Sequence, residues 1–248
     1  MEIKGILFDK DGTLIDFYEV WGTAAEAVEK RLAKRYGFEG QKEIRSLMQD
    51  ALGIEEDGKI LSEGALAYKS YRDIAKDMWE KMHLCTALPD AENLAQVLRE
   101  YFYEEVNEKR KTYPVFTNLP RMMEALVEKK IHIGVATTDE EMATKDCLRR
   151  LGIDSYISFY GTAGNEMPEK PNGKLVHMAA EAWQVKPEEI AVVGDTPNDM
   201  RFAHNAGAVA IGVLSGVGSL DDLQEDADMI LASVDGLPQL LEKISPAS

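Results

Sequence analysis

Short apolar runs, each followed by a turn with polar or glycine residues, constrain the fold of this chain more than any other feature. Helical patterns lie between most of these runs. Strands that are apolar throughout are typical of a parallel sheet buried on both faces. Their alternation with helices predicts an α/β fold, a doubly wound parallel sheet with helices on both sides. The predicted strands cover residues 3–8, 131–136, 190–193, 208–213 and 229–231.

Two predicted helices in this α/β part have clear end signals. One spans residues 139–151, with Asp139 as its predicted N-cap and Gly152 just beyond its last apolar residue. The other opens at Thr196, and Pro197 suits its first position because the first helical turn leaves backbone N–H groups unused. Each helix follows a predicted strand, as a parallel sheet requires.

Residues 16–111 have a different character. The segment lacks β-rich runs and is dense in helix formers. A capping-box pattern begins at Asp16, and a later helix is predicted to begin at Pro89. We therefore expect an all-helical domain, residues 16–111, inserted into an α/β core domain formed by residues 1–15 and 112–248.

The charge of the chain limits its partners. The 248 residues include 44 acidic and 28 basic ones, a formal net charge of −16. A field of this sign repels phosphate backbones and anionic lipid, so neither nucleic acid nor a membrane is an expected partner. No run approaches the ~20 apolar residues that span a bilayer, and the N-terminus is too lightly apolar for a signal peptide. We expect a cytoplasmic protein in which Cys85 and Cys147 are buried small hydrophobes, because no metal-type cysteine spacing occurs.

The first acidic motif, Asp9-Lys10-Asp11-Gly12-Thr13, follows the first predicted strand directly. Ligands of open α/β sheets bind at the carboxyl ends of strands. Because residues two apart in an extended chain point the same way, Asp9 and Asp11 are predicted to converge on one site. For an isolated motif of this kind, the alternative is a simple Asp-Gly turn.

A second acidic motif runs from Gly194 to Asp199 and follows another predicted strand. It places Asp195 and Asp199 at a carboxyl end as well. Asp199 has a structural alternative, because it is the third residue of a helix cap begun by Thr196. Clustered carboxylates repel one another, and a hard divalent cation with oxygen ligands, such as Mg²⁺, offsets that repulsion. Zinc is disfavoured because these motifs contain neither His nor Cys.

Two further elements carry groups that suit phosphate binding. Thr137 and Thr138 end a predicted strand ahead of a helix, where hydroxyl and backbone N–H groups can hold phosphate oxygens. The alternative is that they help to cap the helix. Lys170, followed by Pro171 in a loop, would supply a cation for a phosphoryl group. A lone loop lysine is otherwise usually solvated.

The order D-x-D-G-T, Thr after a strand, Lys-Pro and G-D-x-x-x-D resembles the haloacid dehalogenase superfamily of phosphohydrolases. The resemblance covers residues 1–15 and 112–248, and the helical insert sits where the type 1 caps of that family are inserted. The nearest resemblance is to the phosphoglycolate-phosphatase-like branch. Thr138 stands where many relatives have Asn, and Lys10 occupies the variable position of D-x-D. Neither departure disturbs the expected chemistry.

The resemblance implies a role for each matching residue. Asp9 is the expected nucleophile, which forms an aspartyl-phosphate, and Asp11 is the expected general acid and base. Thr137 and Lys170 are expected to bind the transferring phosphate, with Thr138 beside them. Mg²⁺ is the expected cofactor, held by Asp9, the backbone carbonyl of Asp11, Asp195 and, through water, Asp199.

The cap is expected to close over the site and to select the substrate. Its predicted non-helical stretch, residues 57–70, is the expected substrate-facing loop. Lys69, with Lys59 and Arg72, would bind an anionic tail of the substrate, or else these are ordinary surface cations. The expected partner is a small phosphorylated metabolite, with 2-phosphoglycolate as the leading analogy. The protein is expected to be a monomer or a homodimer.

Two other functions stay open. A phosphomutase of the same superfamily, similar to β-phosphoglucomutase, usually carries a His shortly after D-x-D, whereas the first His here is His83. A non-catalytic phosphate-sensing protein would not need an intact set of Asp9, Asp11, Lys170 and Asp195. The favoured function is therefore Mg²⁺-dependent hydrolysis of a small phosphate monoester.

Overall fold

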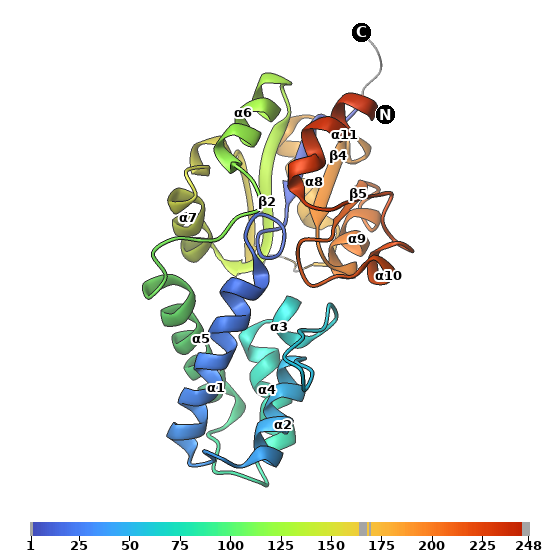
Figure 1. Ribbon diagram of the computed structural model, residues 1–248. Coiled ribbons are helices and arrows are strands. Elements are labelled where there is room, and N and C mark those ends of the chain that lie inside the picture. Colours follow the sequence, from blue (N-terminus) through green and yellow to red (C-terminus); the bar gives the residue numbers. More distant parts are fainter. Residues whose placement is uncertain (1, 164–167, 169, 245–248) are drawn as a thin grey trace. The chain divides into compact units, whose positions relative to one another are not determined.

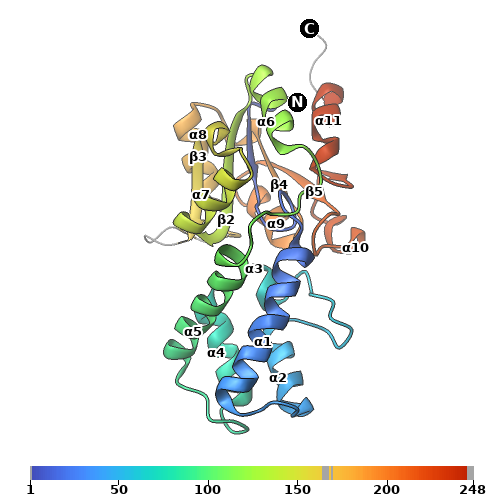
Figure 2. The same cartoon turned by 60° about the vertical axis from the view of Figure 1, so that its left-hand side comes forward.

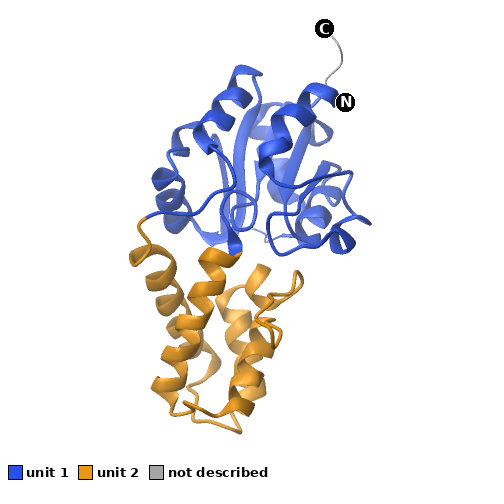
Figure 3. Cartoon of the chain, in the orientation of Figure 1, with its two compact units in different colours: residues 1–17, 112–248 blue, residues 18–111 orange. Residues whose placement is uncertain are grey.

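The chain folds into two compact units in the computed structural model, which describes residues 2–163, 168 and 170–244. Unit 1 consists of Met1–Phe17 and Thr112–Ser248, and unit 2 is Tyr18–Lys111 (Figure 3). The first boundary therefore falls after residue 17, whereas the sequence places it after residue 15. The second boundary falls after residue 111, where the sequence also places it.

Unit 1 is built on a parallel sheet with the strand order β3-β2-β1-β4-β5-β6 (Figure 1). The chain winds outward from β1 to β3 and then returns to β4 on the other side of β1. The order thus reverses between β1 and β4, which makes the sheet doubly wound, as predicted. The strands are β1 (Gly5–Phe8), β2 (His132–Glu140), β3 (Phe159–Ala163), β4 (Ile190–Gly194), β5 (Val209–Val213) and β6 (Met229–Leu231).

Strand β3 was not predicted from the sequence. It lies at the edge of the sheet, and most of its residues are only half-buried. Its sequence, Phe-Tyr-Gly-Thr-Ala, therefore lacks the continuous apolar run by which the central strands were recognised.

Alternate residues of the central strands enter two separate cores. Ile6 and Phe8 of β1 face one side of the sheet, and Leu7 faces the other, as the period of two in a strand requires. Helices α6, α7 and α11 cover the first face, and α8, α9 and α10 cover the second (Figures 1 and 2). Leu7 and Phe8 are completely buried. Each contributes roughly 1.5–3 kcal/mol of hydrophobic stabilisation, which holds the end of β1 in place.

The helical elements of unit 1 separate the strands. Its α-helices are α6 (Leu119–Glu128), α7 (Glu141–Arg150), α8 (Lys174–Trp183), α9 (Pro197–His204), α10 (Leu220–Leu223) and α11 (Leu237–Ile244). Short 3₁₀ turns occur at η3 (Asp154–Tyr156), η4 (Pro187–Glu189) and η5 (Val234–Gly236).

The predicted N-cap of α7 is wrong. Strand β2 continues past Ala136 to Glu140, where it pairs with Ala163 after a shift in register. Helix α7 therefore begins at Glu141, and Glu140 is its N-cap, without a side-chain cap hydrogen bond. Asp139 remains in the strand, and its carboxylate faces a lysine of the first acidic motif, as described below.

Unit 2 is helical, with α1 (Thr23–Tyr36), α2 (Lys42–Leu52), α3 (Ala65–Tyr68), α4 (Tyr71–Met82) and α5 (Ala91–Tyr103). Five-residue π-helical segments, η1 (Tyr18–Gly22) and η2 (Glu104–Glu108), precede α1 and follow α5.

Two details of unit 2 differ from the prediction. The stretch 57–70 contains the short helix α3, so it is not entirely non-helical. Helix α5 begins at Ala91 rather than Pro89, because the carboxylate of Asp90 accepts a hydrogen bond from the backbone N–H of Asn93 and caps the helix. Among the helices that the structure describes, none is both long and apolar enough to cross a membrane.

Candidate active site

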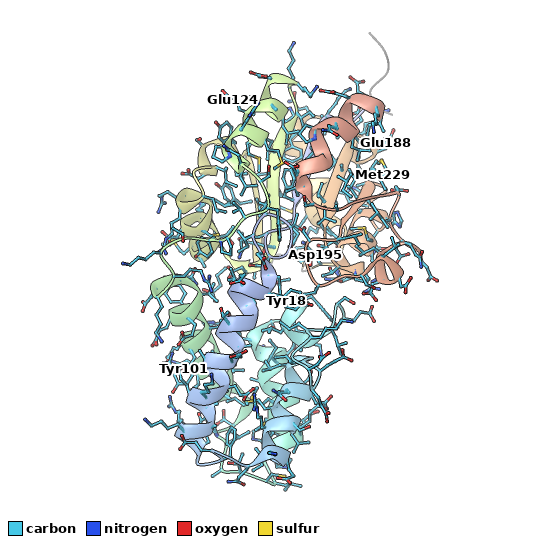
Figure 4. All side chains as sticks on the ribbon, viewed as in Figure 1. Tyr18, Tyr101, Glu124, Glu188, Asp195 and Met229 are labelled. Atoms are coloured by element: carbon cyan, nitrogen blue, oxygen red, sulfur yellow. The ribbon has the colours of Figure 1, made fainter. Side chains whose placement is uncertain are left out.

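The two acidic motifs follow neighbouring strands at the point where the strand order reverses. Phe8 of β1 pairs with Val193 of β4, and the backbone N–H of Asp9 donates to the carbonyl of Val193 at 2.8 Å. Asp195 comes directly after β4, and Figure 4 labels it. Crevices at such reversal points are the usual ligand sites of open α/β sheets.

Lys170 joins the two motifs. Its Nζ lies 2.6 Å from Oδ1 of Asp9 and 2.6 Å from Oδ1 of Asp199. The Lys170 side chain is 4% exposed, so both contacts are shielded from water. Charge-assisted hydrogen bonds of this length are the strong ones in proteins. The structure thus brings together Asp9, Lys170 and Asp199, which lie far apart in the sequence.

Asp195 is held from several sides. Its Oδ1 accepts from the hydroxyl of Thr13 at 3.3 Å, and its Oδ2 accepts from the backbone N–H of Val217 at 2.9 Å. Gly12 has a φ of +88°, and a Cβ at Gly12 or at Gly216 would collide with the Asp195 carboxylate. Glycine is therefore required at both places, for a left-handed turn at the first and for close approach at both.

Asp199 has both of the roles that the sequence left open. Its Oδ2 accepts from the backbone N–H and the hydroxyl of Thr196 at 3.1 and 2.6 Å, and the Thr196 hydroxyl accepts from the Asp199 N–H. This reciprocal pair is the capping box of α9. The other carboxylate oxygen, Oδ1, pairs with Lys170. The helix cap therefore fixes the carboxylate that positions the lysine.

The charges of the site depend on one another. Burial raises the pKa of Asp9 to about 7, against the opposing effect of Lys170, and Asp199 adds to the rise. Burial, then Asp9 and Asp199, raise the pKa of Asp195 well above its usual range. Burial lowers the pKa of Lys170, but Asp199 and Asp9 outweigh it and hold that pKa above its ordinary value. The site therefore carries more negative charge than Lys170 alone neutralises.

The donor set fits a magnesium ion that keeps several water ligands. All the donors are oxygens, and the raised pKa values of Asp9 and Asp195 mark two buried carboxylates that a divalent cation would stabilise in their charged form. Within the described residues, no three His, Cys, Asp or Glu side chains are grouped to hold a metal ion. Mg²⁺ here would therefore need the backbone carbonyl of Asp11 and water beside the two carboxylates.

Asp11 lies against a buried lysine. Nζ of Lys10 is 2.6 Å from Oδ2 of Asp11 and 3.4 Å from Oδ2 of Asp139. The Lys10 side chain is 1% exposed. Burial lowers the pKa of Lys10, but Asp11 and then Asp139 raise it well above its ordinary value. Lys10 therefore stays charged between two carboxylates.

Thr137 and Thr138 lie inside β2, which neighbours β1 in the sheet. Thr137 is buried and Thr138 is half-buried. The hydroxyl of Thr137 accepts from the backbone N–H of Asp139 at 3.2 Å. This places both threonines near the carboxyl edge of the sheet that also carries the acidic motifs, and their predicted role in phosphate binding stays a prediction.

A family model for haloacid dehalogenase-like hydrolases matches residues 3–207. The chain belongs to this family. The match spans the acidic motifs, the lysine and the helical unit between them, and it confirms the family predicted from the sequence.

Relatives agree with this membership over the full length. A phosphoglycolate phosphatase from Neisseria meningitidis is 25% identical, over 98% of this chain and 94% of its own. A hydrolase from Pseudomonas syringae superposes with a TM-score of 0.70 at 20% identity, over 98% of this chain and all of that one. A β-phosphoglucomutase from Clostridium difficile has a TM-score of 0.68 at 17% identity, over 97% and 96%. The predicted fold and enzyme class are confirmed: the chain is a hydrolase of this family, and its curated relatives are phosphatases.

Lys69, the predicted substrate contact of the cap, belongs to unit 2. Its Nζ lies 2.6 Å from Oδ2 of Asp77, and this hydrogen bond raises the pKa of Lys69. Both side chains are about one-third exposed. The role of Lys69 in substrate binding stays a prediction.

A hollow in unit 2 is lined by none of the predicted site residues. It has a volume of about 390 Å³ and is lined by the middle of α1, the start of α2 and the segment between them. Arg45 and Glu29 in its wall form an ion pair. The hollow shares no lining residue with the acidic motifs.

Sequence reasoning missed two parts of the site. The first is the segment after β5, in which Ser215 donates to the carbonyl of Gly12 and Val217 donates to Asp195. The signal for it was the pattern Ser-Gly-Val-Gly, which begins at Ser215, separated by one residue from the end of β5. The second is Lys10, which was treated as a variable position. Its signal was a charged residue between two aspartates at the end of an otherwise apolar strand.

Proposed function

We propose that this enzyme is a Mg²⁺-dependent phosphatase that hydrolyses a small phosphate monoester through an aspartyl-phosphate on Asp9. The observation that carries the proposal is the buried Lys170 ammonium, which lies 2.6 Å from a carboxylate oxygen of Asp9. A cation at that distance is placed to neutralise a phosphoryl group as Asp9 attacks it. Family membership supports the same chemistry.

The first half-reaction transfers the phosphoryl group. A carboxylate oxygen of Asp9 attacks phosphorus, and the bond from phosphorus to the ester oxygen breaks. Asp11, two residues along the same loop, gives a proton to the departing oxygen. The product alcohol leaves, and the phosphoryl group remains on Asp9.

The second half-reaction restores the enzyme. Asp11 takes a proton from a water molecule, the water oxygen attacks phosphorus, and the bond from phosphorus to Asp9 breaks. Lys170 and Thr137, with Thr138, hold the phosphoryl oxygens in both steps. Bound Mg²⁺ would neutralise charge on those oxygens. Its ligands would be Asp9, the backbone carbonyl of Asp11, Asp195 and, through water, Asp199.

The substrate that we propose is 2-phosphoglycolate. The support is similarity: curated relatives that align with nearly the whole chain are named phosphoglycolate phosphatases. Such a substrate carries a carboxylate besides its phosphate, and Lys69 is the proposed cation for that tail. The Lys69–Asp77 ion pair would then have to open when substrate binds. Lys69→Met should raise KM for 2-phosphoglycolate and leave kcat within about twofold.

A mutase function is less well supported. The similarity to the β-phosphoglucomutase structure, at 17% identity, shows the fold alone. A mutase must protect its phosphoryl-enzyme from water, and mutases similar to that enzyme use a His soon after D-x-D. The first His in this chain is His83, the C-cap residue of α4, and no His occurs shortly after D-x-D.

Phosphate release from a panel of small phosphate esters tests the proposal. The panel should include 2-phosphoglycolate, sugar phosphates and nucleoside monophosphates, each with Mg²⁺ and with EDTA, for wild type and Asp9→Asn. We expect release that needs Mg²⁺, is fastest with 2-phosphoglycolate and disappears in Asp9→Asn. If release is fastest with another ester, the proposed mechanism stands and that ester takes the place of 2-phosphoglycolate as the proposed substrate. No release from any ester by folded protein with Mg²⁺ would overturn the proposal.

A further inference from the structure

The D-x-D loop is linked to the end of β2 by a buried ion pair that the catalytic steps above do not use. Lys10 contacts Asp11 on one side and Asp139 on the other. We propose that Lys10 and Asp139 are positioning residues that hold the Asp11 carboxylate in the orientation needed for proton transfer. This inference rests on the proposed function, because it assigns an orientation to the general acid of that reaction.

The burial of Lys10 indicates that its charge has a role beyond stability. A lysine that is 1% exposed has left water almost completely, which is costly unless carboxylates pair with it. An apolar side chain would occupy the same space at lower cost, so stability alone does not explain a charge there. The Asp11 and Asp139 side chains are only 15% and 17% exposed. The three groups therefore form one enclosed carboxylate–ammonium–carboxylate unit.

Other groups around Lys10 do not compete for its ammonium. The thiol of Cys147 and the phenol of Tyr113 lie close enough to interact electrostatically with Lys10. Burial raises the pKa of Cys147 to about 12, and burial raises the pKa of Tyr113 as well. Both groups are thus neutral near pH 7, and the two aspartates are the charged groups that orient the lysine.

Asp139 is itself anchored to β2. Its Oδ1 accepts from the backbone N–H of Glu140 at 2.8 Å, and its own N–H donates to the hydroxyl of Thr137 at 3.2 Å. The carboxylate does not cap α7. A continuous set of contacts therefore runs from Thr137 through Asp139 and Lys10 to Asp11. It fixes the acid on one loop relative to the phosphate-binding threonine on the neighbouring strand.

The expected consequence is specific to the leaving group. An alkoxide, as released from 2-phosphoglycolate, needs a proton as it departs, whereas p-nitrophenolate is stable as an anion. The second half-reaction, in which Asp11 takes a proton from water, is the same for both esters, so the comparison is made on kcat/KM, which reports the first half-reaction. A misdirected Asp11 should therefore lower kcat/KM for the alkyl ester far more than kcat/KM for p-nitrophenyl phosphate. General distortion of the site would slow both reactions alike.

The test compares Lys10→Met, Asp139→Asn and the double variant, on 2-phosphoglycolate and p-nitrophenyl phosphate with Mg²⁺. For Lys10→Met we expect kcat/KM on the alkyl ester to fall about 10- to 100-fold, a part of what general acid catalysis supplies. KM for the alkyl ester should change little, and kcat/KM for the aryl ester should fall by at most about threefold. Lys174→Met, a change at an exposed lysine of α8, is the matched control and should retain full activity.

The double variant tests whether Asp139 acts through Lys10. It removes the Asp139 carboxylate together with its cation, so it leaves one carboxylate without Lys10 where Lys10→Met leaves two, and it serves if Lys10→Met fails to fold. If Asp139 works through Lys10, the double variant should lose no more activity than Lys10→Met alone. Equal losses on both esters, or losses that multiply in the double variant, would overturn the inference and leave the phosphatase intact. If another alkyl ester proves to be the best substrate, it takes the place of 2-phosphoglycolate in this comparison. A wild type that hydrolyses no ester of the panel would instead overturn the proposed function, and the inference with it.

Discussion

The ammonium nitrogen of Lys170 lies 2.6 Å from Oδ1 of Asp9, although 161 positions separate the two residues in the sequence. The contact exists because β1 and β4 are neighbours and the capping box of α9 holds Asp199 against the same nitrogen. The sheet thus supplies the position of the nucleophile, and a helix cap supplies the position of its cation.

Replacing Lys170 should abolish most of the activity. Lys170→Met removes the positive charge next to Asp9 and Asp199, so kcat should fall by at least about 100-fold, the scale on which a single stabilising donor acts. Lys170→Arg, which keeps the charge, should retain more activity than Lys170→Met. Steady-state kinetics on the best ester, with Lys174→Met as the exposed control, measure this. Equal activity of Lys170→Met and the control would show that the cation has no part in the chemistry.

Replacing Asp195 and replacing Asp199 should change the Mg²⁺ requirement of the enzyme to different extents. Asp195 is a proposed direct ligand, so Asp195→Asn should raise the Mg²⁺ concentration for half-maximal activity by about tenfold or more. Both oxygens of Asp199 are already engaged by Lys170 and Thr196. Asp199→Asn should therefore shift the Mg²⁺ requirement less, and should lower the free energy of unfolding by about 1 kcal/mol through the weakened cap. Magnesium titrations of both variants measure the Mg²⁺ requirement, and urea unfolding measures the free energy of unfolding. A larger metal shift in Asp199→Asn would reverse the assignment of the two residues.

Asp9 should make the metal-free protein less stable as pH rises. Burial raises its pKa from 3.8 to about 7, so between these values the folded state holds a proton that the unfolded chain has lost. The free energy of unfolding then falls as pH increases through this window. Asp9→Asn cannot ionise, so its stability relative to wild type in EDTA should be greater at about pH 8 than at about pH 5. Urea unfolding at the two pH values measures the difference, and a difference that does not depend on pH would contradict the raised pKa of Asp9.

The two cysteines should differ sharply in reactivity. Cys85 is exposed and Cys147 is buried, and burial raises the pKa of the Cys147 thiol to about 12. Because the thiolate is the reactive form, a thiol reagent at neutral pH should label Cys85 quickly and reach Cys147 only after unfolding. The Cys85→Ser variant should show no fast labelling. Rapid labelling of Cys147 in that folded variant would mean that the region beside Lys10 is open to solvent.

Much of the fold was predictable because its signals are local. The central strands are apolar runs, and helix α9 opens with a capping box that can be recognised in sequence. The edge strand β3 escaped because a half-buried strand needs no apolar run. Asp139 was assigned to a helix cap because its local pattern fits one, whereas in the structure β2 continues, after a shift in register, to the pairing of Glu140 with Ala163.

The site residues that belong to sequence motifs could be predicted. The contacts between residues from distant parts of the chain could not. Asp9 and Asp195 were recognised from their places after strands, Lys170 from its loop beside Pro171, and all three from a family resemblance. The burial of Lys10 and the enclosure of Asp195 by the segment after β5 depend on contacts between distant parts of the chain. One cysteine expectation failed for the same reason: Cys147 is buried as predicted, whereas Cys85 is exposed.

Trapping the phosphoryl group on the enzyme tests whether Asp9 is the nucleophile. Wild type is mixed with a ³²P-labelled substrate ester and Mg²⁺ and quenched with acid during turnover. Borohydride then reduces an acyl-phosphate to an alcohol, which converts the modified aspartate to homoserine. We expect label on wild type, none on Asp9→Asn, and homoserine at position 9 by peptide mass spectrometry. Turnover by wild type without trapped label, or homoserine at another position, would contradict the assignment of Asp9 as the nucleophile.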